Sequence, residues 1–154
     1  APTHHLYGLN VALDMILKEG IEAVWRRHEV LASAIWAAIE SWEKGGELRA
    51  NIQDKKLRSA AVTSLQVQTP KGTHIRKWLQ ANTGLTIGIG LGMATPNDPN
   101  GDGYFRLGHM GHVNAQMIMA LIATLETAMI AVGVPHGNNA INKAASVIAK
   151  FSEP

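Results

Sequence analysis

Hydrophobic residues recur at helical spacing through the first part of the chain. One stripe is made of residues three or four positions apart: Leu6, Leu9, Leu13, Ile16 and Leu17. Gly20 interrupts the pattern, which then continues to Trp42 and ends at the glycine pair that follows Lys44. Apolar residues at this spacing share one face of a helix. Residues 1–44 are therefore expected to form a long helical arm, with the stripe buried in core packing.

The patterns after residue 44 are shorter and include strands. Residues 47–52 are a candidate short strand, and residues 61–68 alternate between apolar and polar side chains, as a half-exposed strand does. A helix that starts with Thr73 as its cap and ends near Gly84 follows.

The remaining patterns predict two more strands and two more helices. The strands are expected at residues 85–89 and 104–107, joined by a glycine-rich and acidic loop. Asn114 is a candidate cap for a long apolar helix, and a last helix is expected at residues 139–151. Hairpin-like strand neighbours favour a mostly antiparallel sheet with helices packed on one face. We therefore predict an α+β fold, with a helical arm at residues 1–44 and a small domain at residues 45–154.

Composition narrows the class of protein. With 154 residues, 46% hydrophobic and 17% charged, the chain is not disordered, and the low charged fraction indicates a surface that meets another surface. No run of Lys and Arg marks a nucleic-acid partner. Residues 117–134 are apolar, but Glu126 at their centre would cost about 2.5–3.5 kcal/mol in a membrane, so a buried helix is expected. The absence of cysteine fits the reducing cytoplasm.

The acidic loop resembles a calcium-binding loop at its start. Asp98, Asn100 and Asp102, followed by a glycine, occupy the first ligand positions of such a loop. The ninth and twelfth positions, however, are Arg106 and His109, and neither suits a hard cation. We therefore expect an exposed, solvated turn and no metal site.

The histidines are the other candidate metal ligands. His109 and His112 are three positions apart, and His4 and His5 are adjacent, but no acidic or thiolate partner lies at a helpful spacing. Structural roles are expected for them. No ordering of Ser, His and Asp points to a catalytic triad.

Arg106 is the strongest candidate for a binding residue. It lies between Phe105 and Leu107, whose side chains are expected to be buried. A guanidinium held by a rigid strand can form two parallel charged hydrogen bonds with a carboxylate. Two readings remain open from the residues alone: a substrate-binding arginine or a structural ion pair.

Three segments together resemble a known family. The order of APTHHLYGLNVALDMILKEGIEAVWRRH, GLTIGIGLG and YFRLGHMGHVN resembles the C-terminal part of the class V pyridoxal phosphate aminotransferases, in particular the alanine–glyoxylate and serine–glyoxylate group. The resemblance covers nearly the whole chain. It implies a fold-type I homodimer in which an upstream large domain of the same subunit carries the cofactor, pyridoxal 5'-phosphate. It also implies that Arg106 binds the substrate α-carboxylate.

The resemblance also implies what the chain lacks. The family's cofactor lysine lies upstream of this segment, as do the tyrosine and threonine that reach the cofactor phosphate of the partner subunit. None of the lysines lies in a segment that resembles the lysine motif: Lys18, Lys44, Lys55, Lys56, Lys71, Lys77, Lys143 and Lys150. We therefore expect a C-terminal fragment without catalytic or cofactor-binding residues, inactive when alone.

The implied reaction moves an amino group between a small amino acid, alanine or serine, and a 2-oxo acid, glyoxylate or pyruvate. A pyridoxamine–pyruvate aminotransferase domain is the first alternative, because that group also has HMG after the arginine. It carries a basic residue between glycines where this chain has Leu91, which favours the glyoxylate group. A non-catalytic dimerisation domain is the second alternative.

Overall fold

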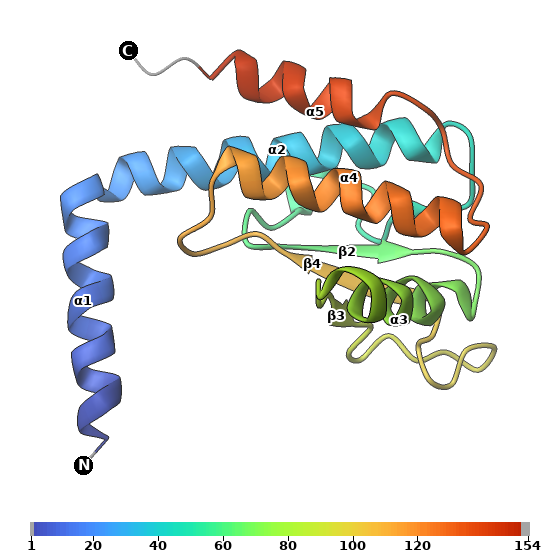
Figure 1. The fold of residues 1–154 in the computed structure, drawn as a ribbon, viewed down its shortest axis with the longest axis horizontal. Helices are drawn as coiled ribbons and strands as arrows, with labels where there is room; N and C mark the ends of the chain where they lie inside the picture. Colours follow the sequence, from blue (N-terminus) through green and yellow to red (C-terminus); the bar gives the residue numbers. More distant parts are fainter. Residues whose placement is uncertain (1, 152–154) are drawn as a thin grey trace.

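Two long helices open the chain and meet at a sharp bend (Figure 1). In the computed structural model, which describes residues 2–151, α1 spans Thr3–Glu19 and α2 spans Ile21–Glu43. The bend lies at Gly20, whose φ of 89° is in the region that favours glycine. The prediction of a helical start interrupted at Gly20 is confirmed.

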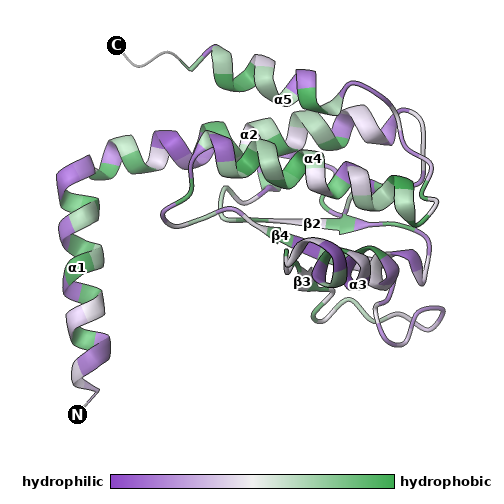
Figure 2. Cartoon of the chain, in the orientation of Figure 1, coloured by the Kyte–Doolittle hydropathy of each residue, from purple (hydrophilic) through white to green (hydrophobic). Residues whose placement is uncertain are grey.

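The two helices differ in what covers them. The second half of α2 packs into the core through residues such as Leu31, Ile35 and Trp42. By contrast α1 projects from the body (Figure 1) and has no buried residue, although part of it is hydrophobic (Figure 2). The expectation that its leucine stripe is core packing is wrong for this chain, because within residues 2–151 α1 contacts little beyond the start of α2. Leu6 is 56% exposed and Leu17 is 76% exposed.

A four-stranded antiparallel sheet forms the base of the body. Its strands are β1 (Arg49–Ala50), β2 (Val62–Gln66), β3 (Gly88–Ile89) and β4 (Tyr104–Gly108), in the order β1-β2-β4-β3. All three pairings are antiparallel. A short 3-10 helix, η1 (Lys55–Leu57), lies between the first two strands. The predicted sheet is confirmed, although its two edge strands are shorter than expected.

Three further helices complete the fold: α3 (Lys71–Thr83), α4 (Ala115–Ala131) and α5 (Ala140–Ala149). Helices α3 and α4 together with α2 cover one face of the sheet, and α5 packs outside them on α2 and α4 (Figure 1). Phe105 and Leu107 of the sheet join these helices in a single hydrophobic core. Glu126 lies within the apolar α4 and accepts a hydrogen bond of 2.7 Å from the indole of Trp42. The α+β fold with helices on one face is confirmed.

Two predicted caps have different outcomes. The side chain of Asn114 caps α4 by accepting a hydrogen bond of 2.9 Å from the backbone N–H of Met117, as predicted. Thr73 does not cap α3, which begins two residues earlier at Lys71; its hydroxyl instead donates to the carboxylate of Asp102. Within residues 2–151, no helix is both long and apolar enough to cross a membrane.

Candidate functional site

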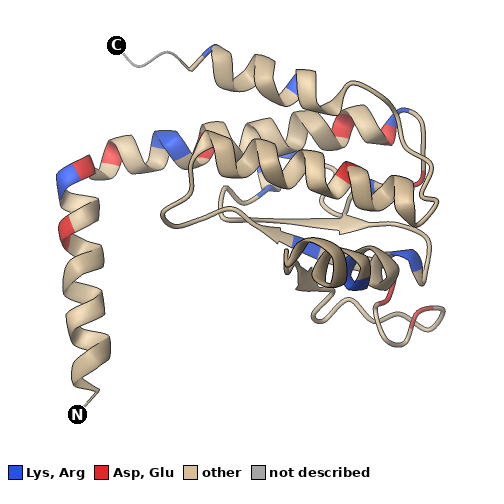
Figure 3. Ribbon diagram, viewed as in Figure 1, with Lys and Arg blue, Asp and Glu red and all other residues tan. Residues whose placement is uncertain are grey.

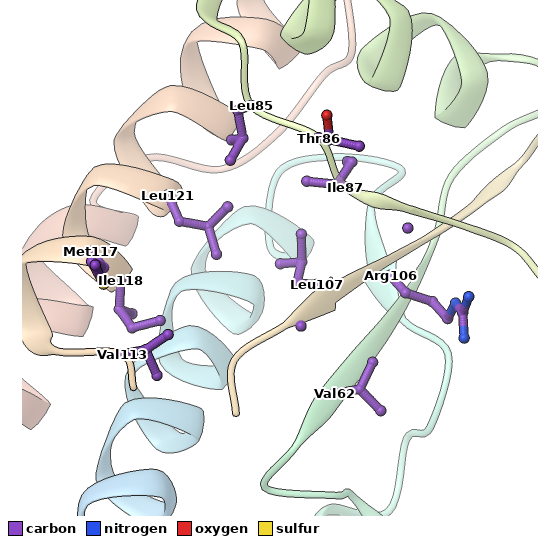
Figure 4. Close-up of a pocket in the computed structure, with 12 residues that line it drawn as sticks. Val62, Leu85, Thr86, Ile87, Arg106, Leu107, Val113, Met117, Ile118 and Leu121 are labelled. Atoms are coloured by element: carbon purple, nitrogen blue, oxygen red, sulfur yellow. The ribbon is translucent and has the colours of Figure 1, made fainter. Parts of the chain in front are cut away.

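Arg106 lies on the face of the sheet that the helices leave uncovered. Alternate side chains of a strand point to opposite faces. Phe105 and Leu107 are therefore buried under the helices, at 0% and 2% exposure, while Arg106 between them points the other way. Figure 4 shows Leu107 directed towards Leu121 of α4 and Arg106 extending from the opposite side of β4.

Glycines on the neighbouring strand make room for Arg106. Gly88 is its pairing partner on β3, and a Cβ at Gly88 would lie 3.3 Å from the Cβ of Arg106. Two residues on, a Cβ at Gly90 would lie only 2.5 Å from the Cβ of Tyr104. Both glycines leave the space that side chains on the same face of β4 occupy. This contact accounts for the first two glycines of the segment GIGLG; the third, Gly92, has a positive φ of 74° instead.

The guanidinium of Arg106 is fixed at one nitrogen. Its Nε donates a hydrogen bond of 2.8 Å to the carbonyl oxygen of Ile89. Among residues 2–151, no carboxylate pairs with Arg106 and no acceptor is found for its two terminal nitrogens. The structural ion pair that the sequence left open is therefore not present between described residues. Two parallel N–H donors on a rigid strand are the arrangement that binds a carboxylate.

The surroundings of Arg106 are mixed in polarity. Ser64 of β2 is the residue paired with Arg106 of β4, and its hydroxyl donates a hydrogen bond of 3.4 Å to the sulfur of Met93. A pocket of about 260 Å³ lies on this side, lined by Arg106, Ser64 and Met93 together with apolar residues such as Val62. At the other end of the face, Tyr104 accepts a hydrogen bond from a glutamine of β2. Arg106 is thus a half-buried cation beside a partly apolar pocket.

Asp98 has a structural role that the sequence did not reveal. Its carboxylate accepts hydrogen bonds from the backbone N–H groups of Asp102 and Gly103, at 2.9 and 2.8 Å, and from the hydroxyl of Thr69 at 3.1 Å. Burial acts to raise the pKa of Asp98, but these hydrogen bonds outweigh it and hold the pKa below the usual range. The side chain is only 8% exposed, so the expectation of a fully solvated turn is wrong at this residue. Asn100 is exposed, as expected.

The histidines do not come together. His109 is fully buried; its Nδ1 lies 3.0 Å from the carbonyl oxygen of Ala60 and its Nε2 lies 2.8 Å from the hydroxyl of Thr63. Burial lowers the pKa of His109. His112 is exposed beyond the strand, and His4 and His5 lie on α1. Within the described part of the chain, no group of three or more acidic or histidine residues could hold a metal ion.

The lysines lie on the surface. All are exposed except Lys71, which is half-buried and pairs with Glu47 at 3.1 Å. None of them lines the pocket beside Arg106. Among residues 2–151, the pocket beside Arg106 is therefore lined by guanidinium groups and by no lysine amine.

A second arginine makes more contacts than its sequence position indicated. Arg27, in the segment WRRH, binds the carboxylate of Glu19 and the carbonyl oxygens of Gly111 and Val113. In the sequence, only the spacing of Arg27 and Glu19 across a helix-breaking glycine indicates a contact of Arg27, and it does not predict the contacts with Gly111 and Val113.

The chain is similar to known aminotransferases in sequence. No protein-family model matches the chain. The serine–glyoxylate aminotransferase of Arabidopsis thaliana is 34% identical over 133 residues, which cover 84% of this chain and 30% of that enzyme. The L-aspartate–glyoxylate aminotransferase of Paracoccus denitrificans is 31% identical over 137 residues, covering 87% and 32%.

A solved structure extends the likeness to the fold. The crystal structure of pyridoxamine–pyruvate aminotransferase from Mesorhizobium loti superimposes with a TM-score of 0.79 at 27% identity, covering 94% of this chain and 35% of that one. The chain thus spans about a third of the length of the relatives it matches. In sequence and in fold, it corresponds to the C-terminal portion of the class V, fold-type I aminotransferases.

Proposed function

We propose that this chain is the substrate-carboxylate-binding portion of a pyridoxal phosphate-dependent aminotransferase. The observation that carries the proposal is the guanidinium of Arg106, which is anchored at Nε and has both terminal nitrogens unpaired among residues 2–151. The resemblance to the family assigns the same residue to the α-carboxylate. A bidentate contact would fix the orientation of the substrate's α-amino group for reaction.

The residues of this chain fit the substrate side of such a site. When bound, pyridoxal phosphate supplies the reactive carbonyl and the electron sink for amino transfer. The chain's lysines are on its surface, away from Arg106, which supports a cofactor lysine in the upstream large domain. Arg106 would hold the carboxylate of the donor and then that of the 2-oxo acid, since both present the same group.

We propose a small amino acid, alanine or serine, as donor and glyoxylate or pyruvate as acceptor. Two relatives act on glyoxylate according to their names, with serine and L-aspartate as donors. Leu91, which stands where the pyridoxamine–pyruvate group has a basic residue, further supports a glyoxylate acceptor. We also propose a cytoplasmic homodimer, as the family resemblance implies.

The pyridoxamine–pyruvate activity is the second candidate, because the solved structure with that activity superimposes on almost the whole chain. A non-catalytic dimerisation domain is the third, and it is supported by the uncovered apolar residues of α1.

The test is a matrix of donors and acceptors with the full-length protein. Serine, alanine, L-aspartate and pyridoxamine are each paired with glyoxylate and with pyruvate, and the amino product is quantified. The proposal predicts the highest kcat/KM for serine or alanine with glyoxylate. Turnover of pyridoxamine with pyruvate alone would favour the second candidate, and no turnover of any pair by cofactor-loaded protein would favour the third.

A further inference from the structure

Arg27 joins the ends of two successive helices to a loop more than 80 residues away in sequence. Its Nε and Nη2 donate to the two carboxylate oxygens of Glu19, at 2.6 and 2.9 Å. Its Nη1 donates to the carbonyl oxygens of Gly111 and Val113, at 3.1 and 2.8 Å. One side chain on α2 thus holds the end of α1 and the loop between β4 and α4.

The ion pair between Arg27 and Glu19 is partly shielded and favours the charged form of both side chains. The Arg27 and Glu19 side chains are 22% and 31% exposed, so both are partly shielded from solvent. The hydrogen bond from Arg27 lowers the pKa of Glu19, and the same bond raises the pKa of Arg27. Both shifts favour the charged forms. A bidentate arginine–carboxylate contact of this kind also restricts orientation.

The ion pair spans the bend at Gly20, where α1 has little else to hold it. No residue of α1 is buried. Among residues 2–151, Arg27 with Glu19 is the ion pair that ties α1 to the rest of the chain. Figure 3 shows that the charged residues of α1 lie in its half nearest the bend. The direction in which α1 leaves the body therefore depends on this contact.

The loop held by Arg27 is the direct continuation of the strand that carries Arg106. His109, three residues after Arg106, is fully buried. His28, next to Arg27 on α2, accepts a hydrogen bond of 2.9 Å from the backbone N–H of Gly111. The end of β4 is thus fixed to the same turn of α2 that binds α1.

We propose that Arg27 is a positioning residue: by tying α1 to the loop after β4, it sets where Arg106 stands relative to the upstream part of the enzyme. This inference rests on the proposed function, because it gives Arg27 a role only if Arg106 binds substrate. The simpler role, anchoring the loop alone, needs the contacts to Gly111 and Val113 but not the one to Glu19. The two roles therefore differ in what Glu19 contributes.

The experiment compares variants of the full-length enzyme by donor kcat/KM, bound cofactor and melting temperature. Arg27→Met removes every contact, and Glu19→Ala removes only the link to α1. Arg26→Ala is the matched control, since this neighbour is exposed and makes no ion pair with any residue from 2 to 151. Each change is also made in an Arg106→Lys enzyme.

We expect Arg27→Met to lower donor kcat/KM by about ten- to a hundredfold, as a displaced binding group does, with cofactor retained. Glu19→Ala should lower it by about two- to fivefold, the range for a partly exposed ion pair, and Arg26→Ala should leave it unchanged. In the Arg106→Lys enzyme the effects of both changes should largely vanish, because residues that act through one group are not additive.

Equal effects of Arg27→Met in both backgrounds, or an unchanged kcat/KM in Glu19→Ala, would overturn the inference and leave Arg27 as a loop anchor. If Arg27→Met does not fold, Glu19→Ala decides alone, since it alters only one exposed helix end. A normal donor KM in Arg106→Ala would instead contradict the proposed function itself, so the two failures are distinguishable.

Discussion

Replacing Thr63 by valine tests the buried network that holds the end of β4. The hydroxyl of Thr63 accepts a hydrogen bond of 2.9 Å from the indole of Trp36 and lies 2.8 Å from Nε2 of His109. If Nδ1 of His109 donates to the carbonyl of Ala60, its Nε2 is the acceptor and Thr63 donates to it. One hydroxyl therefore satisfies two polar side chains at a site that is 5% exposed.

The expected cost follows from the two partners that lose their hydrogen bonds. Valine keeps the branched shape of threonine, so little cavity forms. Each buried polar group left unpaired costs about 1–3 kcal/mol. His109 is fully buried and Trp36 half-buried, so we expect a total of about 3 kcal/mol. In a chain of this size that corresponds to a fall in melting temperature of about 6–12 °C.

The assay is thermal and urea unfolding of the 154-residue chain at pH 7.5, with Thr63→Ser as control. Serine keeps the hydroxyl and loses one methyl group, which should cost about 1 kcal/mol. The reasoning is refuted if Thr63→Val and Thr63→Ser unfold at the same urea concentration, because losing both hydrogen bonds of the hydroxyl would then cost no more than losing one methyl group.

Three further outcomes are expected. Asp98→Asn should lower the melting temperature while Asn100→Ala does not, because an amide N–H₂ would face a backbone N–H. Calcium titration of the wild-type chain should give no isotherm, and a micromolar isotherm abolished by Asp98→Asn would contradict the structural role of Asp98. Pyridoxal phosphate followed by reductant should label the lysines of the isolated chain only sparsely, and one dominant adduct by mass spectrometry would contradict the placement of the cofactor lysine upstream. Stability should fall as the pH drops below about 6.5. Burial lowers the pKa of His109, so the unfolded chain takes up a proton at a higher pH than the folded chain does. If the urea midpoint of a His109→Gln chain changes between pH 7.5 and 5.5 as much as that of the wild type, this explanation is disproved.

Local patterns predicted the elements but not the contacts between them. The periodicity up to Trp42 and the alternation in β2 are set by which face of an element is apolar, so the helices and the antiparallel sheet followed from them. The hydrogen bonds of Asp98 come from backbone N–H groups that only the folded loop presents, and aspartate is equally common in exposed turns. Its burial was therefore not predictable.

The candidate site shows the same division. The flanking apolar residues made Arg106 the candidate, and the structure adds that Gly88 leaves space for its side chain. That arrangement requires the strand order, which no local pattern contains. Leu6 and Leu17 show the converse: a stripe that is apolar in sequence stays exposed in this chain, since a periodic pattern predicts a face but not what covers it.

The most direct test of the account is the donor KM of the full-length enzyme with Arg106 replaced. Arg106→Ala should keep its bound cofactor and its melting temperature but lose about two to three orders of magnitude in donor kcat/KM, because charged hydrogen bonds contribute about 1.5–3 kcal/mol each. Arg106→Lys should recover only part of the loss, since an ammonium cannot match both carboxylate oxygens. A near-normal donor KM in an Arg106→Ala enzyme with a lowered melting temperature would contradict the account, because the substrate carboxylate would then be held elsewhere.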